Sequence, residues 1–451
     1  MKNITIIGGG ASGTLVAVNL LQKAGERPVE ITLAERQSRL GRGVAFGTTR
    51  PAHLLNVPAG RMGAYPDDVE HFHRWLGENG HEFGANDFVP RLLFGEYLRS
   101  VFEGAVDGAG SSVGFEHMDD EAVDLSINDG SADVMLASGE ILRSHHVVLA
   151  FGNFHPPHPS VPDRAFTAAE KYFVDPWGSR LYETITPDDS LFIVGTGLSM
   201  VDVALHLHQT GHRGKITAIS TRGLLPERHE LGHTYPSFAD ELEGMTRITD
   251  VLKCVRRHVK QADSNGGNWR GVIDSLRPVT QKMWLDLPLT EKRLFLQHLS
   301  RYWNVARHRM PAEVGSILDE MQTAGQLEIL KGRLSDITFD KDSFNISYST
   351  PDTTRTLSAD ILVNCIGSEP NFSRIDSTFV KNLYSRGHVR NDELDFGIAA
   401  TRDGDVIGRD GKPSRIIHTL GTALKGTLWE TTAIPEIRTQ ARELALRLVA
   451  S

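Results

Sequence analysis

Two stretches of the chain share the same order of apolar, glycine-rich and helix-like positions. The apolar run Ile4–Ile7 leads into a cluster of glycines, and residues 11–25 then carry apolar side chains at helical spacing. The second stretch repeats this order, with apolar residues over 191–194, two glycines, and a helical pattern over 199–211. Because an apolar run that ends in glycines before a helix is typical of a buried strand and a tight turn, the pattern predicts two βαβ units.

The first glycine cluster has the spacing of a dinucleotide-binding turn. Gly8, Gly10 and Gly13 form GxGxxG, and the strand predicted next, over 29–35, ends in Glu35, 27 residues after Gly8. The glycines allow close approach of a pyrophosphate, the helix N-terminus stabilises its charge, and a terminal acid accepts hydrogen bonds from an adenosine ribose. A glycine-rich turn in an ordinary α/β protein would combine these features only by coincidence. We therefore predict a first dinucleotide site here.

The second cluster departs from the first at two positions. Gly195 and Gly197 repeat the turn, but Met200 replaces the third glycine, and Ser199 beside it opens the predicted helix. The residue 27 positions after Gly195 is Arg222, where the first unit has an acid. An acid suits a free ribose hydroxyl, whereas an arginine suits a 2′-phosphate. We therefore predict FAD in the first unit and NADPH in the second, the alternative for Arg222 being a solvated loop arginine.

The order of the predicted elements indicates an α/β fold with two Rossmann-like dinucleotide-binding domains of three layers each. At 451 residues the chain has room for two or three domains. We expect an NAD(P)H domain, residues 188–359, nested in an FAD domain formed by residues 1–155 and 360–451. Apolar strands that end on glycines, such as the one closing at Gly152, would connect the two domains. Residues from about 235 to 310 predict a helical insertion, whose aromatic side chains we assign mainly to core packing.

The net charge and the cysteine content limit which kinds of binding partner are expected. The formal net charge is −9 and no Lys/Arg run is present, so nucleic acid is not expected to bind. Cys254 and Cys365, 111 positions apart, form neither a disulfide framework nor a CxxC pair for zinc or redox exchange. No apolar stretch reaches the roughly 18 residues that span a bilayer, and the first apolar run is too short for a signal peptide. We expect a cytoplasmic protein without membrane or metal partners.

The proline-containing stretch 156–187 predicts a linker.

Longer motifs add a family resemblance. They are "IIGGGASG", "GRGVAFGTTRPAHLLNVPAGRMGAYPDDVEHFHRWL", "VPRLLFGEYL", "VGTGLSMVDVALHL", "STRGLLPERH", "RYWNVARHRM" and "GTLWETTAIPEIRTQA". Together they resemble the FAD/NAD(P)-binding protein family typified by the bacterial YdhS-like proteins. The layout is more distantly similar to flavin-containing and N-hydroxylating monooxygenases, which bind FAD and NADPH in two Rossmann-like domains. Because architecture does not determine function, the resemblance implies the fold rather than one particular reaction.

The resemblance also implies which residues hold the adenosine and pyrophosphate parts of FAD. Arg42 and Gly43 would lie along the pyrophosphate and ribityl chain, and the backbone of Val123 would read the adenine. The adenosine diphosphate half would be bound by Gly8, Gly10, Ser12, Gly13 and Glu35.

The same resemblance places two segments around the flavin ring. The segment "HLLNVP" would approach the isoalloxazine through His53, Leu54, Asn56 and Val57. The C-terminal segment would close over the flavin with Gly421, Trp429, Glu430 and Thr431. Pro435 suits the first turn of a helix, and the N-terminus of that helix could stabilise negative charge at the flavin N1 and O2.

The expected function is that of an FAD-dependent, NADPH-using oxidoreductase. The resemblance implies a monooxygenase that uses O2 to oxygenate a small amine, thiol or carbonyl compound through a flavin C4a-hydroperoxide, with Asn56 or His53 as the polar group near flavin N5. One alternative is an NAD(P)H dehydrogenase that passes electrons to a quinone or a protein carrier. Another is a non-enzymatic module that senses redox state through its FAD. Disulfide reduction is excluded, because the chain has no CxxC or CxxxxC pair.

Overall fold

The first glycine motif lies at the centre of a six-stranded sheet. The computed structural model describes residues 1–25, 27–37 and 40–451. In it the first apolar run is a strand with a parallel neighbour on each side, as a buried central strand requires. The strands lie in the order β16 (Asp405–Ile407), β17 (Pro413–Thr419), β7 (His146–Leu149), β1 (Lys2–Ile7), β2 (Val29–Ala34) and β3 (Val113–Met118), with β16 antiparallel to β17.

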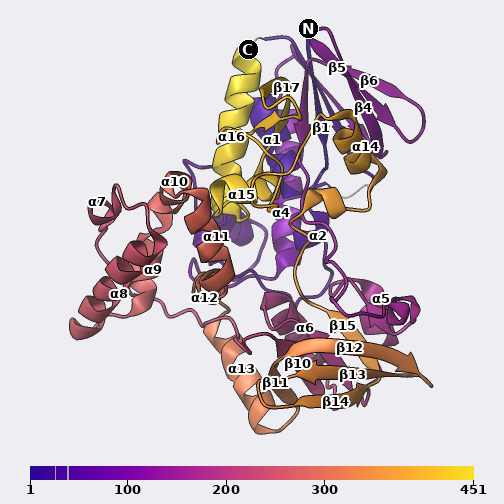
Figure 1. The fold of residues 1–451 in the computed structure, drawn as a ribbon. Coiled ribbons are helices and arrows are strands. Elements are labelled where there is room, and N and C mark those ends of the chain that lie inside the picture. The colour runs from indigo at the N-terminus through magenta and orange to yellow at the C-terminus, as the bar shows by residue number, and fades with distance from the viewer. Residues whose placement is uncertain (26, 38–39) are drawn as a thin grey trace.

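Two further layers cover this sheet, so the FAD domain has the three layers expected (Figure 1). One face is covered by α1 (Ala11–Lys23), α4 (Arg91–Asp107) and α16 (Ile434–Ala450), which share a core with Leu15, Tyr97 and Leu444. The other face is covered by α14 (Thr378–Arg386) and by an antiparallel sheet of β4 (Ala122–Asn128), β5 (Ser131–Leu136) and β6 (Ile141–Ser144). Shorter elements are α2 (Gly43–Phe46), η1 (Ala59–Arg61), α3 (His71–Glu78), η3 (Phe372–Arg374), η4 (Gly421–Leu424) and α15 (Lys425–Leu428).

The second glycine motif is built into a second domain of the same design. Its parallel sheet has the order β11 (Leu327–Lys331), β10 (Ile216–Ser220), β9 (Leu191–Val194), β15 (Ile361–Asn364) and β8 (Tyr172–Phe173). One face packs on α5 (Ser179–Thr184), α6 (Leu198–Gln209) and α13 (Ala312–Thr323). The other packs on an antiparallel sheet of β12 (Arg333–Asp340), β13 (Ser343–Ser349) and β14 (Thr354–Ala359).

Two expected boundaries are wrong. The second FAD segment does not begin at residue 360, because β15 pairs with β9 in the second sheet and the chain returns to the first domain only after Asn364. The expected linker 156–187 contributes η2 (Ala165–Ala168), β8 and α5 to the second domain. A strand of two residues such as β8 has no periodicity that sequence alone could show, because its place is decided by pairing with β15.

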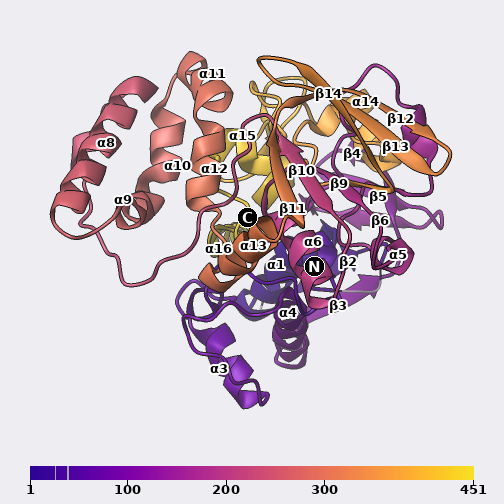
Figure 2. The ribbon, with the colours of Figure 1, turned by 90° about the horizontal axis from the view of Figure 1, so that it is seen from below.

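A helical insertion leaves the second domain after β10 and re-enters it before α13. Its helices are α7 (Ala239–Leu242), α8 (Ile248–Ser264), α9 (Trp269–Ser275), α10 (Arg277–Asp286), α11 (Leu289–His298) and α12 (Ser300–Arg307), which lie within the range of about 235–310 expected for a helical insertion. Figure 2 shows this helical group beside the C-terminal segment around α15. Trp284 of α10 stacks on Trp429 with ring centroids 5.0 Å apart, so the insertion packs on the FAD domain. No helix within the described residues is both long and apolar enough to cross a membrane.

One buried ion pair ties the two domains together. Arg91, at the start of α4, donates to Asp202 of α6, with Nη1 to Oδ2 at 2.8 Å and Nη2 to Oδ1 at 3.1 Å. Trp177 Nε1 donates to the same carboxylate at 2.9 Å. Only 14% and 7% of the two side chains of the pair are exposed. Burial raises the pKa of Asp202, while Arg91 opposes that shift. A buried carboxylate depends on such a partner, so the relative placement of the domains depends on Arg91.

We predict that Arg91→Met lowers the free energy of unfolding by about 3–5 kcal/mol at neutral pH, because the Asp202 carboxylate is left buried without its counter-charge. Without Arg91, the pKa of Asp202 in the folded state rises further above its value in the unfolded chain. Stability of the variant should therefore fall as pH rises through the folded pKa and partly recover in acid, where Asp202 is neutral. Urea unfolding at several pH values measures both effects.

Arg213→Met serves as the matched control, because Arg213 pairs with Asp188 at the surface, where 66% and 71% of the side chains are exposed. This variant should stay close to wild type, since exposed pairs are screened by solvent. Equal losses in the two variants would show that the Arg91 pair does not join the domains in the way described.

Candidate functional site

The first glycine turn has the shape of a pyrophosphate site. Two of its glycines, Gly8 and Gly13, are required by close backbone contacts, and the side at Gly10 is open. Gly8 has φ of 106°, and a Cβ there would lie 2.7 Å from the Ala150 carbonyl oxygen. A Cβ on Gly13 would lie 1.9 Å from the carbonyl oxygen of Gly8, so α1 packs on its strand only with glycine at that position. Among the described residues, a Cβ on Gly10 would come within 4 Å of the Gly43 Cα alone, at 3.6 Å. The turn is thus packed on the protein side and open beyond Gly10, as a phosphate cradle should be.

The carboxylate of Glu35 lies at the same turn. Its Oε2 accepts a hydrogen bond from the Gly9 N–H at 2.7 Å, and its Oε1 accepts one from the Gln37 N–H at 3.0 Å. Glu35 directly follows the end of β2, and these hydrogen bonds hold its carboxylate against the glycine turn. A ribose bound beside the turn would lie at this place. On the other side, Gly43 takes a φ of 50° and comes close to Gly10, with Arg42 capping α2. These residues fit FAD, and their contacts with it stay a prediction.

The C-terminal segment folds back onto the first turn. Gly421 has φ of 69°, and a Cβ there would lie 3.0 Å from Ser12 Oγ at the start of α1. The Gly421 N–H donates to Gln440 Oε1 at 2.8 Å, while its carbonyl accepts from Thr431 Oγ1 at 3.3 Å. Pro435 is in the first turn of α16, as expected. Ser12 and Gly421, about 400 positions apart in the chain, therefore meet at the place where we expect the flavin to bind.

The second turn repeats the first with one change of packing. Gly195 has φ of 110°, and a Cβ would lie 2.2 Å from the carbonyl oxygen of Cys365. A Cβ on Gly197 would meet no atom within 4 Å, so this side of the turn is open. Met200, at the third glycine position, buries its side chain in the core of the second domain, and Ser199 lies half-buried before it. A missing third glycine therefore changes the packing of the helix but leaves the cradle intact.

Arg222 lies exposed just beyond the end of β10. Among the residues that the structure describes, no acceptor or carboxylate pairs with its guanidinium. The 27-residue offset is not matched by the strand register: Gly8 donates to the Ala34 carbonyl and Gly195 to that of Ile219, so Ser220 is the counterpart of Glu35 and Arg222 lies two positions further on. The loop after this strand still borders the place of a dinucleotide's adenosine ribose in this fold. The guanidinium is therefore placed to meet a 2′-phosphate, and this role stays a prediction.

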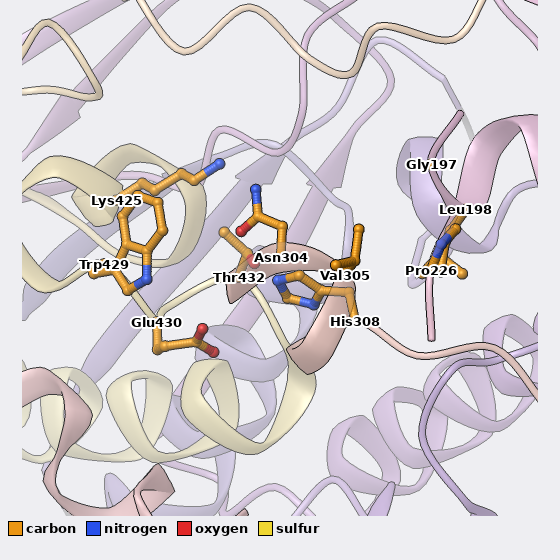
Figure 3. Close-up of a pocket in the computed structure, with 10 residues that line it drawn as sticks. All are labelled: Gly197, Leu198, Pro226, Asn304, Val305, His308, Lys425, Trp429, Glu430 and Thr432. Atoms are coloured by element: carbon orange, nitrogen blue, oxygen red, sulfur yellow. The ribbon is translucent and has the colours of Figure 1, made fainter. Parts of the chain in front are cut away.

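A cavity of about 240 Å³ lies where three parts of the chain meet (Figure 3). Figure 3 shows residues of α12 between the second glycine turn and the C-terminal segment. A smaller cavity, of about 130 Å³, shares His308 and Glu430 with the first and adds Asn56, Val57 and Arg307. The first cavity is lined by Gly197, Leu198, Pro226, Asn304, Val305, His308, Lys425, Trp429, Glu430 and Thr432. We call the two together the junction site.

Charged groups at the junction site are mostly removed from water. Glu430 accepts a hydrogen bond from Trp303 Nε1 at 2.7 Å, and 9% of its side chain is exposed. Burial lowers the pKa of His308 to about 4, so its imidazole is neutral at pH 7, with one ring nitrogen able to donate a hydrogen bond and the other able to accept one. Burial also lowers the pKa of Lys425, whose ammonium lies over the rings of Phe396 and Trp429 at 5.2 and 5.9 Å.

Trp429 carries backbone strain at this site. Its φ of 63° and ψ of −77° are those of a rare, strained γ-turn conformation. The ring is held by stacking on Trp284 and by edge contact with Phe295, whose centroid is 5.0 Å away. Its indole Nε1 is buried without a hydrogen-bond partner among the described residues. Strain of this kind persists where packing enforces it, and it is concentrated at functional sites.

His53 is not at the junction site. Its side chain is fully buried between the two domains, where Nδ1 bonds Thr48 Oγ1 at 2.7 Å and Nε2 bonds Tyr182 OH at 3.2 Å. Burial, together with nearby cations, lowers its pKa to about 3. Both ring nitrogens are therefore occupied, and the structure gives His53 the position of a packing residue. Its expected catalytic role finds no geometric support.

Three other expected cofactor residues lie apart from the cavities. Leu54 bridges to Pro90, and its carbonyl accepts from Arg91 Nε at 2.9 Å. Val123 stands at an irregularity in β4, and its carbonyl already accepts from Asn382 Nδ2 at 2.8 Å. Gly152 is exposed in the loop after β7. Their contacts with FAD stay predictions.

Sequence reasoning missed the polar face of α12. Asn304, Arg307 and His308 follow helical i, i+3, i+4 spacing, and all three line a cavity of the junction site. Lys425, in the C-terminal segment, was missed as well. The motif "RYWNVARHRM" held the signal, because it places an asparagine, an arginine and a histidine on one face of a helix in the insertion.

One group of potential metal ligands lies away from this site. Glu241, Cys254 and His258, in the insertion, have ligand atoms within 4.8 Å of one another. The guanidinium of Arg257 donates to both Glu241 and Cys254, which places a positive charge where an ion would lie. The expected absence of a metal stays a prediction.

The fold and its paired glycine turns define the architecture of a two-domain FAD- and NAD(P)-binding flavoprotein. Residues 5–154 match the family model described as FAD-NAD(P)-binding. The chain is also similar to the uncharacterized protein YdhS of Escherichia coli (strain K12), with 27% identity over 264 residues. That alignment covers 50% of this chain and 47% of the relative, so it spans about half the length of each protein. The resemblance seen in the sequence motifs is thereby confirmed.

Solved structures share the fold over nearly the full chain. The ornithine N-hydroxylase of Kutzneria sp. 744 has a TM-score of 0.66 at 15% identity, covering 99% of both chains. L-lysine 6-monooxygenase of Pseudomonas syringae has a TM-score of 0.63 at 16% identity, again over 99% of each chain. The bacillithiol disulfide reductase Bdr of Bacillus cereus has a TM-score of 0.57 at 14% identity, over 100% of this chain and 99% of that one. These matches confirm the expected fold class, and at such identities they show the fold alone.

We predict that Gly13→Ala destabilises the protein by about 1–3 kcal/mol and weakens FAD retention, because the new Cβ forces α1 away from Gly8. Thermal unfolding and the flavin content of purified protein measure the two effects. Gly77→Ala is the control, since Gly77 is an exposed residue of α3 whose Cβ would meet nothing within 4 Å. There alanine should be neutral or stabilising by its helix propensity. Unchanged stability and flavin content in Gly13→Ala would contradict the steric argument.

Arg222→Ala should remove most of a preference for NADPH over NADH. Charge-assisted hydrogen bonds to a 2′-phosphate should give the wild type a preference of about ten- to a hundredfold. Dissociation constants for the two coenzymes measure this ratio directly. Arg355→Ala, at an exposed arginine of β14, should leave the ratio unchanged. Equal affinity of the wild type for both coenzymes would rule out this role for Arg222.

Proposed function

We propose that this chain is an FAD- and NADPH-dependent oxidoreductase that uses O2 to oxygenate a small nucleophilic substrate. The observation that carries the proposal is the junction site, where the turn suited to a nicotinamide dinucleotide and the segment that closes on the first turn line one cavity. A nicotinamide and a flavin bound at these turns would therefore meet beside a space for a small molecule. The full-length likeness to an ornithine N-hydroxylase and a lysine 6-monooxygenase supports the same proposal.

The residues present fit both cofactors. The open side of the turn around Gly10 would take the pyrophosphate of FAD, and Glu35 its ribose. The open side at Gly197 would take the pyrophosphate of NADPH, and Arg222 its 2′-phosphate. Bound FAD supplies two-electron chemistry and the activation of O2, so the chain itself needs no acid–base pair for that step.

The chain's own groups bind, orient and exclude water. Asn56 lines the smaller cavity, half-buried, and its carbonyl accepts from His229 Nε2 at 3.0 Å, which holds the backbone still. Its side-chain amide makes no hydrogen bond to a described residue and is available as a donor. His308 is neutral at pH 7 and can donate or accept a hydrogen bond beside Glu430. The stacked Trp284 and Trp429 close the site toward the insertion, which keeps water away from the reacting groups.

Rapid mixing separates this proposal from the two alternatives. Protein reduced with NADPH and then mixed with O2 should return to oxidised flavin in two phases, with hydrogen peroxide released only in the second. Reoxidation in one phase together with fast reduction of a quinone would instead support a dehydrogenase. Very slow reduction by NADPH would support a redox-sensing module.

Asn56→Ala should shorten the interval between the two phases by about three- to tenfold and raise peroxide release, because one hydrogen-bond donor beside the flavin is lost. Asn265→Ala is the control, since Asn265 is exposed at the end of α8 and lines neither cavity of the junction site. Identical time courses for the two variants would show that Asn56 has no part in the oxygen reaction.

A further inference from the structure

Arg307 is a buried cation whose hydrogen-bonding capacity is largely unused. It lies on α12 at the smaller cavity, and 11% of its side chain is exposed. Its Nε is buried and has no hydrogen-bond partner among residues 1–25, 27–37 and 40–451. Within the part of the chain that the structure describes, its ion-pair partner is Glu430, with Nη2 and Oε2 3.8 Å apart. That separation is too long for a good hydrogen bond, and Glu430 already accepts one from Trp303.

Two neighbouring buried or half-buried arginines of the same cavity are satisfied, while Arg61, which also lines it, is exposed to water. Arg277 makes a bidentate pair with Glu436, at 2.8 and 3.0 Å. Arg309 pairs with Asp274, and its Nε donates to the Ala306 carbonyl at 2.8 Å. The fold thus neutralises two of these guanidiniums with carboxylates of its own and leaves Arg307 without a close acceptor.

A second cation makes the charge balance of the junction site positive. Lys425 lines the larger cavity and rests on two aromatic rings, without a hydrogen bond to any described residue. The lining carboxylates of Glu230 and Asp274 are paired with Arg270 and Arg309. With His308 neutral, Arg307 and Lys425 are left to share the carboxylate of Glu430. Burying a charge without acceptors is costly, so a site of this kind is completed by an anion.

We propose that the substrate carries an anionic oxygen group, such as a carboxylate, and that Arg307 binds it in the smaller cavity. The inference rests on the proposed function and names the substrate class of the same site. A guanidinium presents a planar fork of N–H donors that matches two oxygens of one acid. Asn56 and Val57 line this cavity as well, so a substrate anchored there lies against the segment expected beside the flavin ring. The second glycine turn lines only the larger cavity, which separates Arg307 from the place of the nucleotide pyrophosphate.

The test uses the oxidised, FAD-containing protein and two probes of equal shape, benzoate and its neutral counterpart benzamide. Calorimetry, together with the change in flavin absorbance, gives the dissociation constants. The wild type should bind benzoate about tenfold or more tightly than benzamide. Arg307→Ala should weaken benzoate about ten- to a hundredfold and leave benzamide unchanged, while Arg307→Lys should lie between. Arg301→Ala, on the exposed side of the same helix, should bind as the wild type does.

Several outcomes would overturn the proposal. One is equal binding of the two probes, or no binding of either, by the wild type. Another is an unchanged benzoate affinity in Arg307→Ala. A selective loss of NADP⁺ affinity in that variant would assign Arg307 to the coenzyme phosphates instead. Should Arg307→Ala fail to retain FAD, Arg307→Lys and the wild-type comparison of probes still decide.

The same measurements keep this proposal apart from the proposed function. Probe binding needs neither NADPH nor O2. Protein that binds benzoate through Arg307 but is not reduced by NADPH would contradict the proposed function alone. Protein that shows the two-phase oxygen reaction without preferring benzoate would contradict the anionic substrate alone.

Discussion

The guanidinium of Arg91 holds the parts of the site in register. Its Nη atoms pair with Asp202, one turn into the helix that follows the second glycine turn, and its Nε donates to the Leu54 carbonyl in the segment expected beside the flavin. One side chain thus connects the flavin-side loop of the first domain with the nicotinamide-side helix of the second. Because the ion pair is buried, the domains cannot separate without breaking it. The cavities between the domains depend on that placement.

The two domains share the same arrangement of strands, glycine turn and covering layers. In each, a central parallel strand ends in a glycine with strongly positive φ, Gly8 in the first and Gly195 in the second, whose Cβ would strike the backbone after a neighbouring strand. Each sheet is covered by helices on one face and by a three-stranded antiparallel sheet on the other. The differences are confined to the ligand side. Glu35 directly follows the second strand of one unit, whereas the other unit has Ser220 at that position and Arg222 two residues further on, which suits two different adenosine riboses.

The helical insertion turns a crevice between two domains into a lined site. It starts in the second domain but packs on the C-terminal segment of the first through Trp284 and Trp429. Packing on both sides enforces the strained backbone of Trp429, which in turn sets the direction of the next residue, Glu430. The same packing brings the polar face of α12 against these residues, so that an exposed-looking helical pattern becomes the wall of a cavity.

The amino-acid sequence by itself determined the features that depend on local geometry. The glycine turns, the acid after the second strand of the first unit, the helix with Pro435 in its first turn and the helical pattern of the insertion follow from spacing and periodicity within about 30 residues. Only the tertiary structure decided which distant segments meet. It moved residues 361–364 into the second sheet and buried His53 between the domains with both ring nitrogens bonded. It also brought Arg307 to Glu430, more than a hundred positions away. Such contacts arise from packing between elements, and packing has no period along the chain, so the sequence pattern carries no local trace of them.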